Sequence, residues 1–169
     1  MLSALLVGCA GAEAQWQRVS ASYPAPDFTL ASLDGRSVTL SAFRGRVVLV
    51  EFWATWCGPC RYSTPSMEQI AKEFRQQGVE VLLINAGEGS AAIRQWAGRR
   101  FSAATILLDQ DGAVAERYGV NGIPRLLVIN QDGLVQYDEG GYSGGLERNL
   151  RRILGELLAT RTNATPQEV

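Results

Sequence analysis

Along the chain, apolar runs of strand length alternate with segments whose apolar residues recur at helical spacing. Residues 46–53, R-V-V-L-V-E-F-W, form an apolar run of strand length, as expected for a central strand buried on both faces. The apolar positions that follow recur at helical spacing, and they are Met67, Ile70, Ala71 and Phe74. This spacing predicts a helix that begins after Cys57 and continues to about Gln77, where Gly78 ends it.

Further elements alternate in the same way. The pattern predicts strands over 80–85 and 105–108, helices over 90–99, 113–118 and 146–158, and two hairpins, 28–30 with 37–40 and 126–130 with 134–137. Each hairpin surrounds an Asp-Gly turn signal, at Asp34-Gly35 and Asp132-Gly133. We therefore expect an α/β fold with a central mixed sheet flanked by helices on both faces.

One globular domain accounts for the length and composition. The chain has 169 residues, of which 46% are hydrophobic, enough for a single sizeable core. We expect residues 1–23 to be a leader and tether, 24–159 to be the domain, and 160–169 to be a disordered tail.

The first residues, M-L-S-A-L-L-V-G-C, are apolar and small. They are too few to span a membrane as a helix and are similar to the end of a secretory signal. Leu6-Val7-Gly8-Cys9 resembles the lipobox of bacterial lipoproteins, in which the cysteine is lipidated. The alternative is a misplaced start codon before an ordinary signal peptide, with Cys9 lost on cleavage. Both interpretations place the domain outside the cytosol.

Charge and composition exclude several classes of function. The net charge is -1 and no basic block recurs, so we expect no nucleic-acid partner. The chain contains no histidine, which excludes Ser-His-Asp and Cys-His catalysis and imidazole metal sites.

The segment E-F-W-A-T-W-C-G-P-C, residues 51–60, places Cys57 and Cys60 two residues apart. A zinc site lacks ligands, because Cys9 is the one cysteine left. A purely structural disulfide closes a very small loop, so it would constrain the unfolded chain little. The pattern favours a redox pair.

The predicted position between strand and helix suits redox chemistry. There Cys57 meets unpaired backbone N–H groups and the positive end of a helix dipole, which favour a nucleophilic thiolate. Pro59 suits a first helical turn, and Cys60 could attack the mixed disulfide to release the partner. Trp56 is either an apolar rim of this site or a core aromatic residue.

W-C-G-P-C after V-E-F-W-A-T resembles the thioredoxin superfamily. The segments A-P-D-F-T-L, L-S-A-F-R-G-R-V-V-L-V and N-A-G-E-G are similar to its exported TlpA/ResA-like branch, over residues 26–158. The resemblance implies a thioredoxin fold with an N-terminal hairpin and an inserted helix. It also implies thiol-disulfide exchange with protein partners, without metal or organic cofactor.

The resemblance also assigns a partner-binding rim. Gly122-Ile123-Pro124 matches a loop whose proline has a cis peptide bond in relatives, and the preceding backbone pairs with the substrate. The rim then comprises six residues: Trp56, Gly58, Pro59, Ile123, Pro124 and Arg125. Relatives usually have Thr where this chain has Arg125, which could stabilise a thiolate, select an acidic partner, or lie solvated at the surface.

Glu51 is a carboxylate in an otherwise apolar strand, where burial is costly. It lies six residues before Cys57, where thioredoxins have a buried acid that exchanges a proton with the resolving cysteine. The alternative is a Glu51 that reaches water near a strand end. ResA-type proteins often have Glu at the position of Ser63, so a second acid would have to be Glu51 or Glu88.

Two other functions remain open. D-F-T-L with a later Asp-Gly also occurs in peroxiredoxins, but these need a proline where Glu51 stands, four residues before Thr55. Cys57 and Cys60 could instead bind Cu(I) in a non-catalytic carrier. We expect a monomeric, periplasmic, lipid-anchored reductant of protein disulfides of the cytochrome c maturation type, served by a membrane thiol-disulfide electron donor.

Overall fold

A computed structural model describes residue 16 and residues 18–162 of the chain. Eight strands form one mixed sheet in the order β1-β8-β7-β4-β5-β6-β2-β3. The strands are β1 (Arg18–Pro24), β2 (Thr29–Ser32), β3 (Ser37–Thr39), β4 (Val47–Trp53), β5 (Val79–Ala86), β6 (Thr105–Asp109), β7 (Arg125–Ile129) and β8 (Leu134–Gly140). β4, β5 and β6 are parallel, and the remaining pairings are antiparallel.

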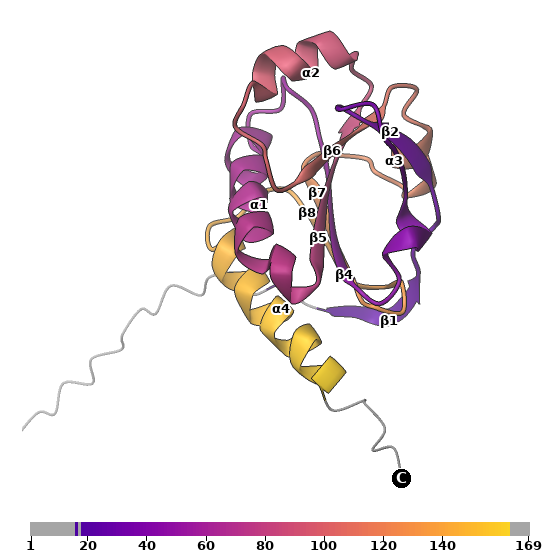
Figure 1. Cartoon of the computed structure of the whole chain (residues 1–169), viewed down its shortest axis with the longest axis vertical. Helices are drawn as coiled ribbons and strands as arrows, with labels where there is room; N and C mark the ends of the chain where they lie inside the picture. Colours follow the sequence, from indigo (N-terminus) through magenta and orange to yellow (C-terminus); the bar gives the residue numbers. More distant parts are fainter. Residues whose placement is uncertain (1–15, 17, 163–169) are drawn as a thin grey trace, which may run out of the picture.

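Helices cover both faces of this sheet. They are α1 (Cys60–Phe74), α2 (Ser90–Ala97), α3 (Ala113–Arg117) and α4 (Leu146–Thr162), with 3-10 turns at Leu40–Phe43 and Arg75–Gln77. Figure 1 shows α1 and α4 on one side of the sheet and α3 on the other. The α/β class, the N-terminal hairpin β2–β3 and the inserted helix α2 between β5 and β6 are confirmed.

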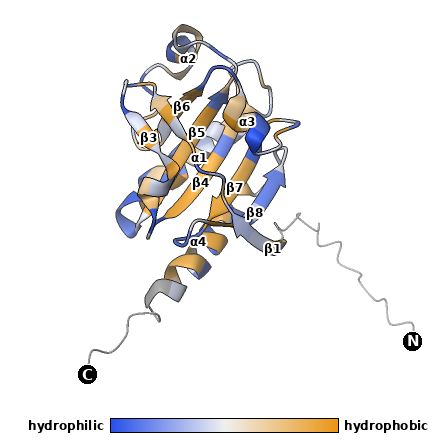
Figure 2. Cartoon of the chain, turned by 90° about the vertical axis from the view of Figure 1, so that its right-hand side faces the viewer, coloured by the Kyte–Doolittle hydropathy of each residue, from blue (hydrophilic) through white to orange (hydrophobic). Residues whose placement is uncertain are grey.

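The central strand β4 separates two core clusters, because successive side chains of a strand point to opposite faces. Leu49 and Trp53 pack with α1 and α4, whereas Val50 and Phe52 pack with α3 and the N-terminal hairpin. Glu51 shares the face of Leu49 and Trp53, so it points toward α1. In Figure 2, β4 and β7 are coloured as hydrophobic and β8 is more hydrophilic.

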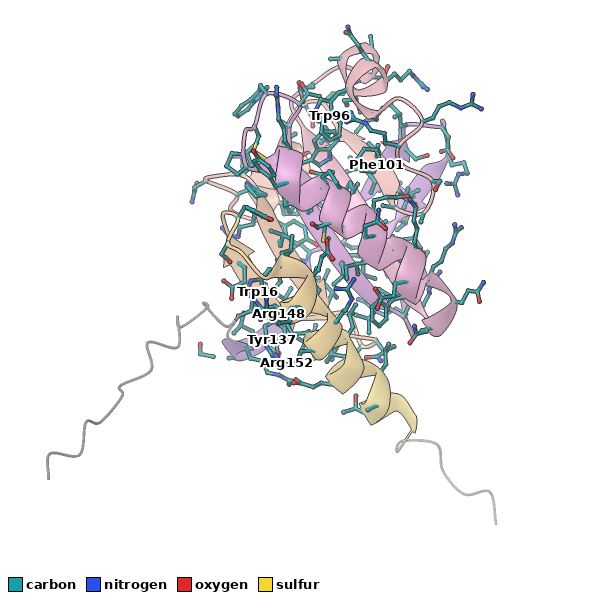
Figure 3. The ribbon with its side chains drawn as sticks, turned by 90° about the vertical axis from the view of Figure 1, so that its left-hand side faces the viewer. Trp16, Trp96, Phe101, Tyr137, Arg148 and Arg152 are labelled. Carbon is teal, nitrogen blue, oxygen red and sulfur yellow. A yellow bond between two sulfur atoms is a disulfide. The ribbon has the colours of Figure 1, made fainter. Side chains whose placement is uncertain are left out.

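The ordered domain begins earlier than expected. Residues 18–23 belong to the edge strand β1, which pairs with β8, instead of to a tether. Trp16 is 8% exposed and belongs to the same core cluster as Tyr137, near which Figure 3 shows it. Val19, Ala21 and Tyr23 alternate with Ser20 and Ser22, but the segment is short, small and polar. Most of β1 is exposed, and its backbone pairing with β8 supports it.

The other end also differs from the expectation. α4 continues to Thr162 instead of ending at Leu158, so residues 160–162 are helical and only 163–169 of the expected tail remain outside the described residues. Cys9 and the rest of the leader, residues 1–15, also lie outside the described residues.

Candidate active site

Both cysteines of the described chain lie at the junction of β4 and α1. Cys57 and Cys60 are joined by a disulfide, with their Cα atoms 5.3 Å apart. Cys60 is the first residue of α1 and is fully buried, while Cys57 lies just before the helix and is 4% exposed. A partner therefore has access to Cys57 and not to Cys60.

Backbone groups surround the sulfur of Cys57. The N–H of Cys60 donates to Sγ of Cys57 at 3.2 Å. The same sulfur lies 3.7 Å from the carbonyl oxygen of Ile123. An N–H donor at the start of a 15-residue helix stabilises negative charge on sulfur, so this arrangement favours the thiolate of Cys57 after reduction.

The loop before β7 faces this pair. The Ile123–Pro124 peptide bond is cis, which confirms the expectation from the resemblance. Pro124 is buried and Ile123 is partly buried. The N–H of Gly141, after β8, donates to the carbonyl oxygen of Pro124 at 2.8 Å and ties two loops together.

The rim of the site is exposed. Trp56 is 70% exposed, so its interpretation as a core aromatic residue was wrong. Gly58 is exposed, and Pro59, also exposed, occupies the N-cap position of α1 instead of its first turn. The carbonyl oxygen of Pro59 accepts hydrogen bonds from the N–H groups of Tyr62 and Ser63, at 3.1 and 3.2 Å.

Glu51 on β4 is fully buried, so the alternative in which it reaches water was wrong. Its Oε1 accepts hydrogen bonds from the hydroxyl of Ser63 and, at 3.3 Å, from that of Thr64. Its Oε2 has no hydrogen-bond partner among the described residues. Burial raises the pKa of Glu51 to about 8, although the two hydroxyls act against this rise.

Sequence reasoning treated Ser63 only as a departure from relatives and did not single out Thr64 as a partner. Both lie on the face of α1 that includes Cys60, three and four residues beyond it. They connect the helix that bears the resolving cysteine to the carboxylate on β4. The helical spacing of Ser63 and Thr64 from Cys60, with a hydroxyl at each position, was the sequence signal from which these partners of Glu51 could have been predicted.

Glu88 differs from Glu51 and does not suit proton transfer near neutral pH. It accepts hydrogen bonds from the N–H of Thr55 at 2.7 Å, from the Thr55 hydroxyl at 2.5 Å and from the Asn85 side chain at 2.8 Å. Burial alone would raise the pKa of Glu88, but these bonds outweigh it and the pKa is lowered. Glu88 therefore stays ionised and holds the loop before Cys57.

Arg125 is paired with a carboxylate. Its guanidinium donates two hydrogen bonds to Asp138 on β8, at 2.5 and 2.7 Å, and one to the carbonyl oxygen of Gly119 at 3.3 Å. Hydrogen bonding to Asp138 is the main cause of the raised pKa of Arg125. Its charge is thus largely compensated within the protein and is not a free cation beside the sulfur pair.

The described part of the chain has neither a candidate metal site nor a membrane-spanning helix. Within residue 16 and residues 18–162, no group of three or more His, Cys, Asp or Glu side chains could hold a metal ion. None of the helices in this part has the length and hydropathy needed to cross a bilayer.

The sequence is similar to one family model and to several named thiol-disulfide oxidoreductases. The sequence model described as Redoxin matches residues 20–154. The chain is 36% identical to thiol-disulfide oxidoreductase ResA of Geobacillus thermodenitrificans over 118 residues, which are 70% of this chain and 68% of the relative. It is 34% identical to ResA of Bacillus subtilis over 119 residues, 70% of this chain and 66% of that protein.

Solved structures resemble the fold over most of its length. A thiol:disulfide interchange protein from Chlorobium tepidum, described as DsbE, aligns with a TM-score of 0.74 and 29% identity, covering 86% of this chain and 99% of that one. An exposed lipoprotein thioredoxin of Streptococcus pneumoniae aligns with a TM-score of 0.68 and 32% identity, covering 78% and 100%.

Proposed function

This chain belongs to the Redoxin family and is a TlpA/ResA-like thiol-disulfide oxidoreductase, and on that basis we propose that it reduces disulfides of partner proteins outside the cytoplasm. The observation that carries the proposal is the asymmetry of the sulfur pair: Cys57 is 4% exposed and receives an N–H donor, whereas Cys60 is fully buried.

The reaction begins with the reduced pair. The thiolate of Cys57 attacks one sulfur of a partner disulfide, forms a mixed disulfide with it, and expels the other partner sulfur as a thiolate that takes up a proton. Cys60 then attacks Sγ of Cys57 and releases the second partner thiolate. Two electrons pass to the partner, and the Cys57–Cys60 disulfide of the structure is the oxidised product.

Glu51 is the proton carrier in this proposal. Cys60 must lose its proton before it can attack, and Glu51 is a buried carboxylate whose pKa of about 8 suits proton uptake near neutral pH. The hydroxyls of Ser63 and Thr64 hold Oε1 against the face of α1 that bears Cys60, while Oε2 has no partner among the described residues.

The exposed rim positions the partner. The carbonyl oxygen of Ile123 lies 3.7 Å from Sγ of Cys57, next to the cis bond to Pro124, and we propose that the backbone before this proline aligns the partner chain. Trp56, Gly58 and Pro59 are exposed on the side where a partner approaches. The sulfur pair carries both electrons, so the reaction as proposed needs no metal or organic cofactor, and the protein works as a monomer.

The location follows from the leader. We propose that Cys9 is lipidated and anchors the domain at the outer side of the membrane, supported by the L-V-G-C motif and by likeness to an exposed lipoprotein thioredoxin. A membrane thiol-disulfide protein would return electrons to the oxidised pair. Apocytochrome c, or another periplasmic protein with a disulfide, would be the acceptor.

The test is the reduction of insulin disulfides with dithiothreitol as the electron source. Cys57→Ser should abolish catalysis, because no thiolate remains to attack. Cys60→Ser should accumulate a mixed disulfide with the substrate, because nothing resolves it. Cys9→Ser is the matched control and should retain full activity; a Cys57→Ser variant with wild-type activity would disprove the proposal.

The direction of electron flow needs a second measurement. Equilibration of the pair with glutathione gives its reduction potential, and we expect a value in the range of thioredoxin, about -270 mV. A value near that of the oxidant DsbA, about -120 mV, would reverse the proposed direction.

A further inference from the structure

A stacked pair of tyrosines lies on the surface near the redox site. Tyr62 and Tyr142 have ring centroids 5.9 Å apart with an interplanar angle of 23°. They are 66% and 41% exposed, and with Trp56 they make three of the four large hydrophobic side chains exposed in the described residues. Exposed apolar side chains that gather in one place commonly mark an interaction surface.

Two elements that meet at the redox site supply these rings. Tyr62 lies on α1, two residues after Cys60. Tyr142 lies in the glycine-rich segment between β8 and α4, beside Gly141, whose N–H is bound to the carbonyl oxygen of Pro124. The stacked pair is therefore joined through the backbone to the cis-proline loop that faces Cys57.

The reaction itself places a partner chain beside the two rings. A mixed disulfide requires the partner's sulfur within bonding distance of Sγ of Cys57, which is only 4% exposed, so the neighbouring partner residues must cover the rim. The Cα atoms of Cys57 and Cys60 are 5.3 Å apart, and Tyr62 lies two helical residues further on. Its Cα is thus at most about 11 Å from that of Cys57, the length of about three extended residues.

The surface beyond the rings also suits an extended chain. Tyr142 is one wall of a groove of about 310 Å³ between α1 and α4, which Ser66, Leu146 and Arg151 also line. The rings provide an apolar surface and the groove a mainly polar one. A partner segment can therefore place an apolar side chain on the rings and continue along the groove.

We propose that Tyr62 and Tyr142 form a binding platform for an apolar or aromatic side chain of the partner polypeptide, about three residues from its reactive cysteine. The partner is an extended, unfolded segment, because such a segment can reach the recessed Cys57, the cis-proline loop and the platform together. This inference rests on the proposed function and adds a determinant of partner choice at the same site.

Peptide disulfides test the platform directly. The probes are symmetric dimers of a short peptide with one cysteine and either Trp or Gly placed three residues to each side of it. In each turnover the reduced protein converts one dimer into two peptide thiols and becomes the disulfide, which dithiothreitol reduces again. The wild type should have a kcat/KM about tenfold higher for the Trp dimer, as expected for an aromatic contact.

The alanine variants should remove this preference. In Tyr62→Ala with Tyr142→Ala, kcat/KM for the Trp dimer should fall about tenfold through KM, to the value for the Gly dimer. Tyr62→Phe with Tyr142→Phe is the matched control; it keeps both rings and should keep the preference. Equal losses for both dimers, or no loss for either, would overturn the proposal.

Oxidised glutathione distinguishes loss of the platform from loss of the reaction. It is too small to span Cys57 and the platform, so the wild type and the tyrosine variants should react with it at similar rates. If Cys57→Ser remained active with glutathione, the proposed function would fail instead of the platform.

Unfolding and sedimentation complete the test. Urea unfolding should give the alanine and phenylalanine variants similar stability, so that a loss of preference in the alanine variant reflects binding and not folding. Sedimentation at several concentrations should find a monomer in every variant. A wild-type dimer that dissociates in the alanine variant would assign the rings to a second copy of the chain and overturn the proposal.

Discussion

Two buried carboxylates on the same side of the sheet have pKa values that are shifted in opposite directions. Glu51 on β4 is fully buried, and burial raises its pKa to about 8. Glu68 on α1 is 2% exposed; burial would also raise its pKa, but hydrogen bonds outweigh burial and the pKa is lowered. Both side chains are nearly inaccessible to solvent, but Glu51 lies deeper in the protein and has fewer donors, so the depth of burial and the number and kind of donors together decide the direction of each pKa shift.

The donors at Glu68 are numerous and fixed. The N–H groups of Ser102, Ala103 and Ala104 donate to its two oxygens at 2.9 to 3.3 Å. The Ser102 hydroxyl adds a bond at 3.2 Å, and the ammonium of Lys72 lies 3.3 Å away. Glu51 has two hydroxyl donors, both to one oxygen. Glu68 therefore serves as a permanent anion that holds a loop, while Glu51 can exchange a proton.

The largest expected effect is the pH dependence of Glu51→Gln. Between about pH 4.5, the ordinary pKa, and about 8, the folded wild type keeps a proton that the unfolded chain has lost. The unfolding free energy of the wild type should thus fall with rising pH, relative to the variant, by about 1.4 kcal/mol per unit and roughly 4 to 5 kcal/mol in total.

Urea unfolding of the oxidised proteins at several pH values measures this difference. Groups common to both proteins cancel in the comparison. Parallel pH profiles for the wild type and the variant would show that Glu51 titrates normally and is not the proton carrier.

Glu68→Gln should show the opposite dependence. At neutral pH the variant loses charge-assisted bonds and leaves backbone N–H groups poorly satisfied, which we expect to cost about 2 to 3 kcal/mol of unfolding free energy. The pKa of Glu68 is lowered, so its contribution is present above pH 4.5 and is lost as the pH falls through the pKa of the folded state.

The matched control for this site is Glu73→Gln on the same helix, where the carboxylate is 41% exposed and pairs with Arg151. Thermal and urea unfolding should show a change below about 1 kcal/mol there. A Glu68→Gln variant as stable as this control at pH 7 would contradict the comparison.

Ser63→Ala should make Glu51 a weaker acid. Removal of its hydroxyl leaves Oε1 with the 3.3 Å bond from Thr64, so the pKa of Glu51 should rise further, by about one unit. The pH–rate profile of mixed-disulfide resolution reports this shift as a limb moved to higher pH. Thr64→Val is the control and should give a smaller shift in the same direction. Identical profiles in all three proteins would show that these hydroxyls do not set the pKa of Glu51.

Lys72→Ala should have the smallest effect. Lys72 is 46% exposed and pairs with Glu68 across one helical turn. Water screens such a pair, so we expect a loss of about 0.5 kcal/mol in unfolding free energy. A loss as large as that of Glu68→Gln would mean that the ammonium, and not the backbone N–H groups, keeps Glu68 ionised.

Much of the fold was predictable because neighbouring residues carry its signals. The apolar run of β4, the helical spacing in α1 and the two Asp-Gly turns predicted their elements to within a few residues. The edge strand β1 was missed because its residues are mostly small, polar and exposed, so its short alternation resembles a tether, and its partner β8 lies more than 100 residues away.

The site was predictable to a similar extent. The cysteine pair, the burial of Glu51 and the cis bond before Pro124 agree with the sequence analysis. The partners of Glu51 and the ion pair of Arg125 with Asp138 were missed. Each missed contact joins two elements, and a linear pattern does not specify which side chains of two elements meet.

By itself, the sequence determined the chemistry of this protein. Cys57 and Cys60 between an apolar strand and a helix imply a thiolate at a helix N-terminus, because the N–H groups that stabilise it come from the adjacent residues. Only the tertiary structure decided how the surroundings modify that chemistry. Ser63 reaches Glu51 from another element, the 102–104 backbone reaches Glu68, and Tyr142 stacks on Tyr62 from 80 residues away. These contacts depend on the packing of α1, the sheet and the loops, because distant segments approach one another only when the whole core is assembled.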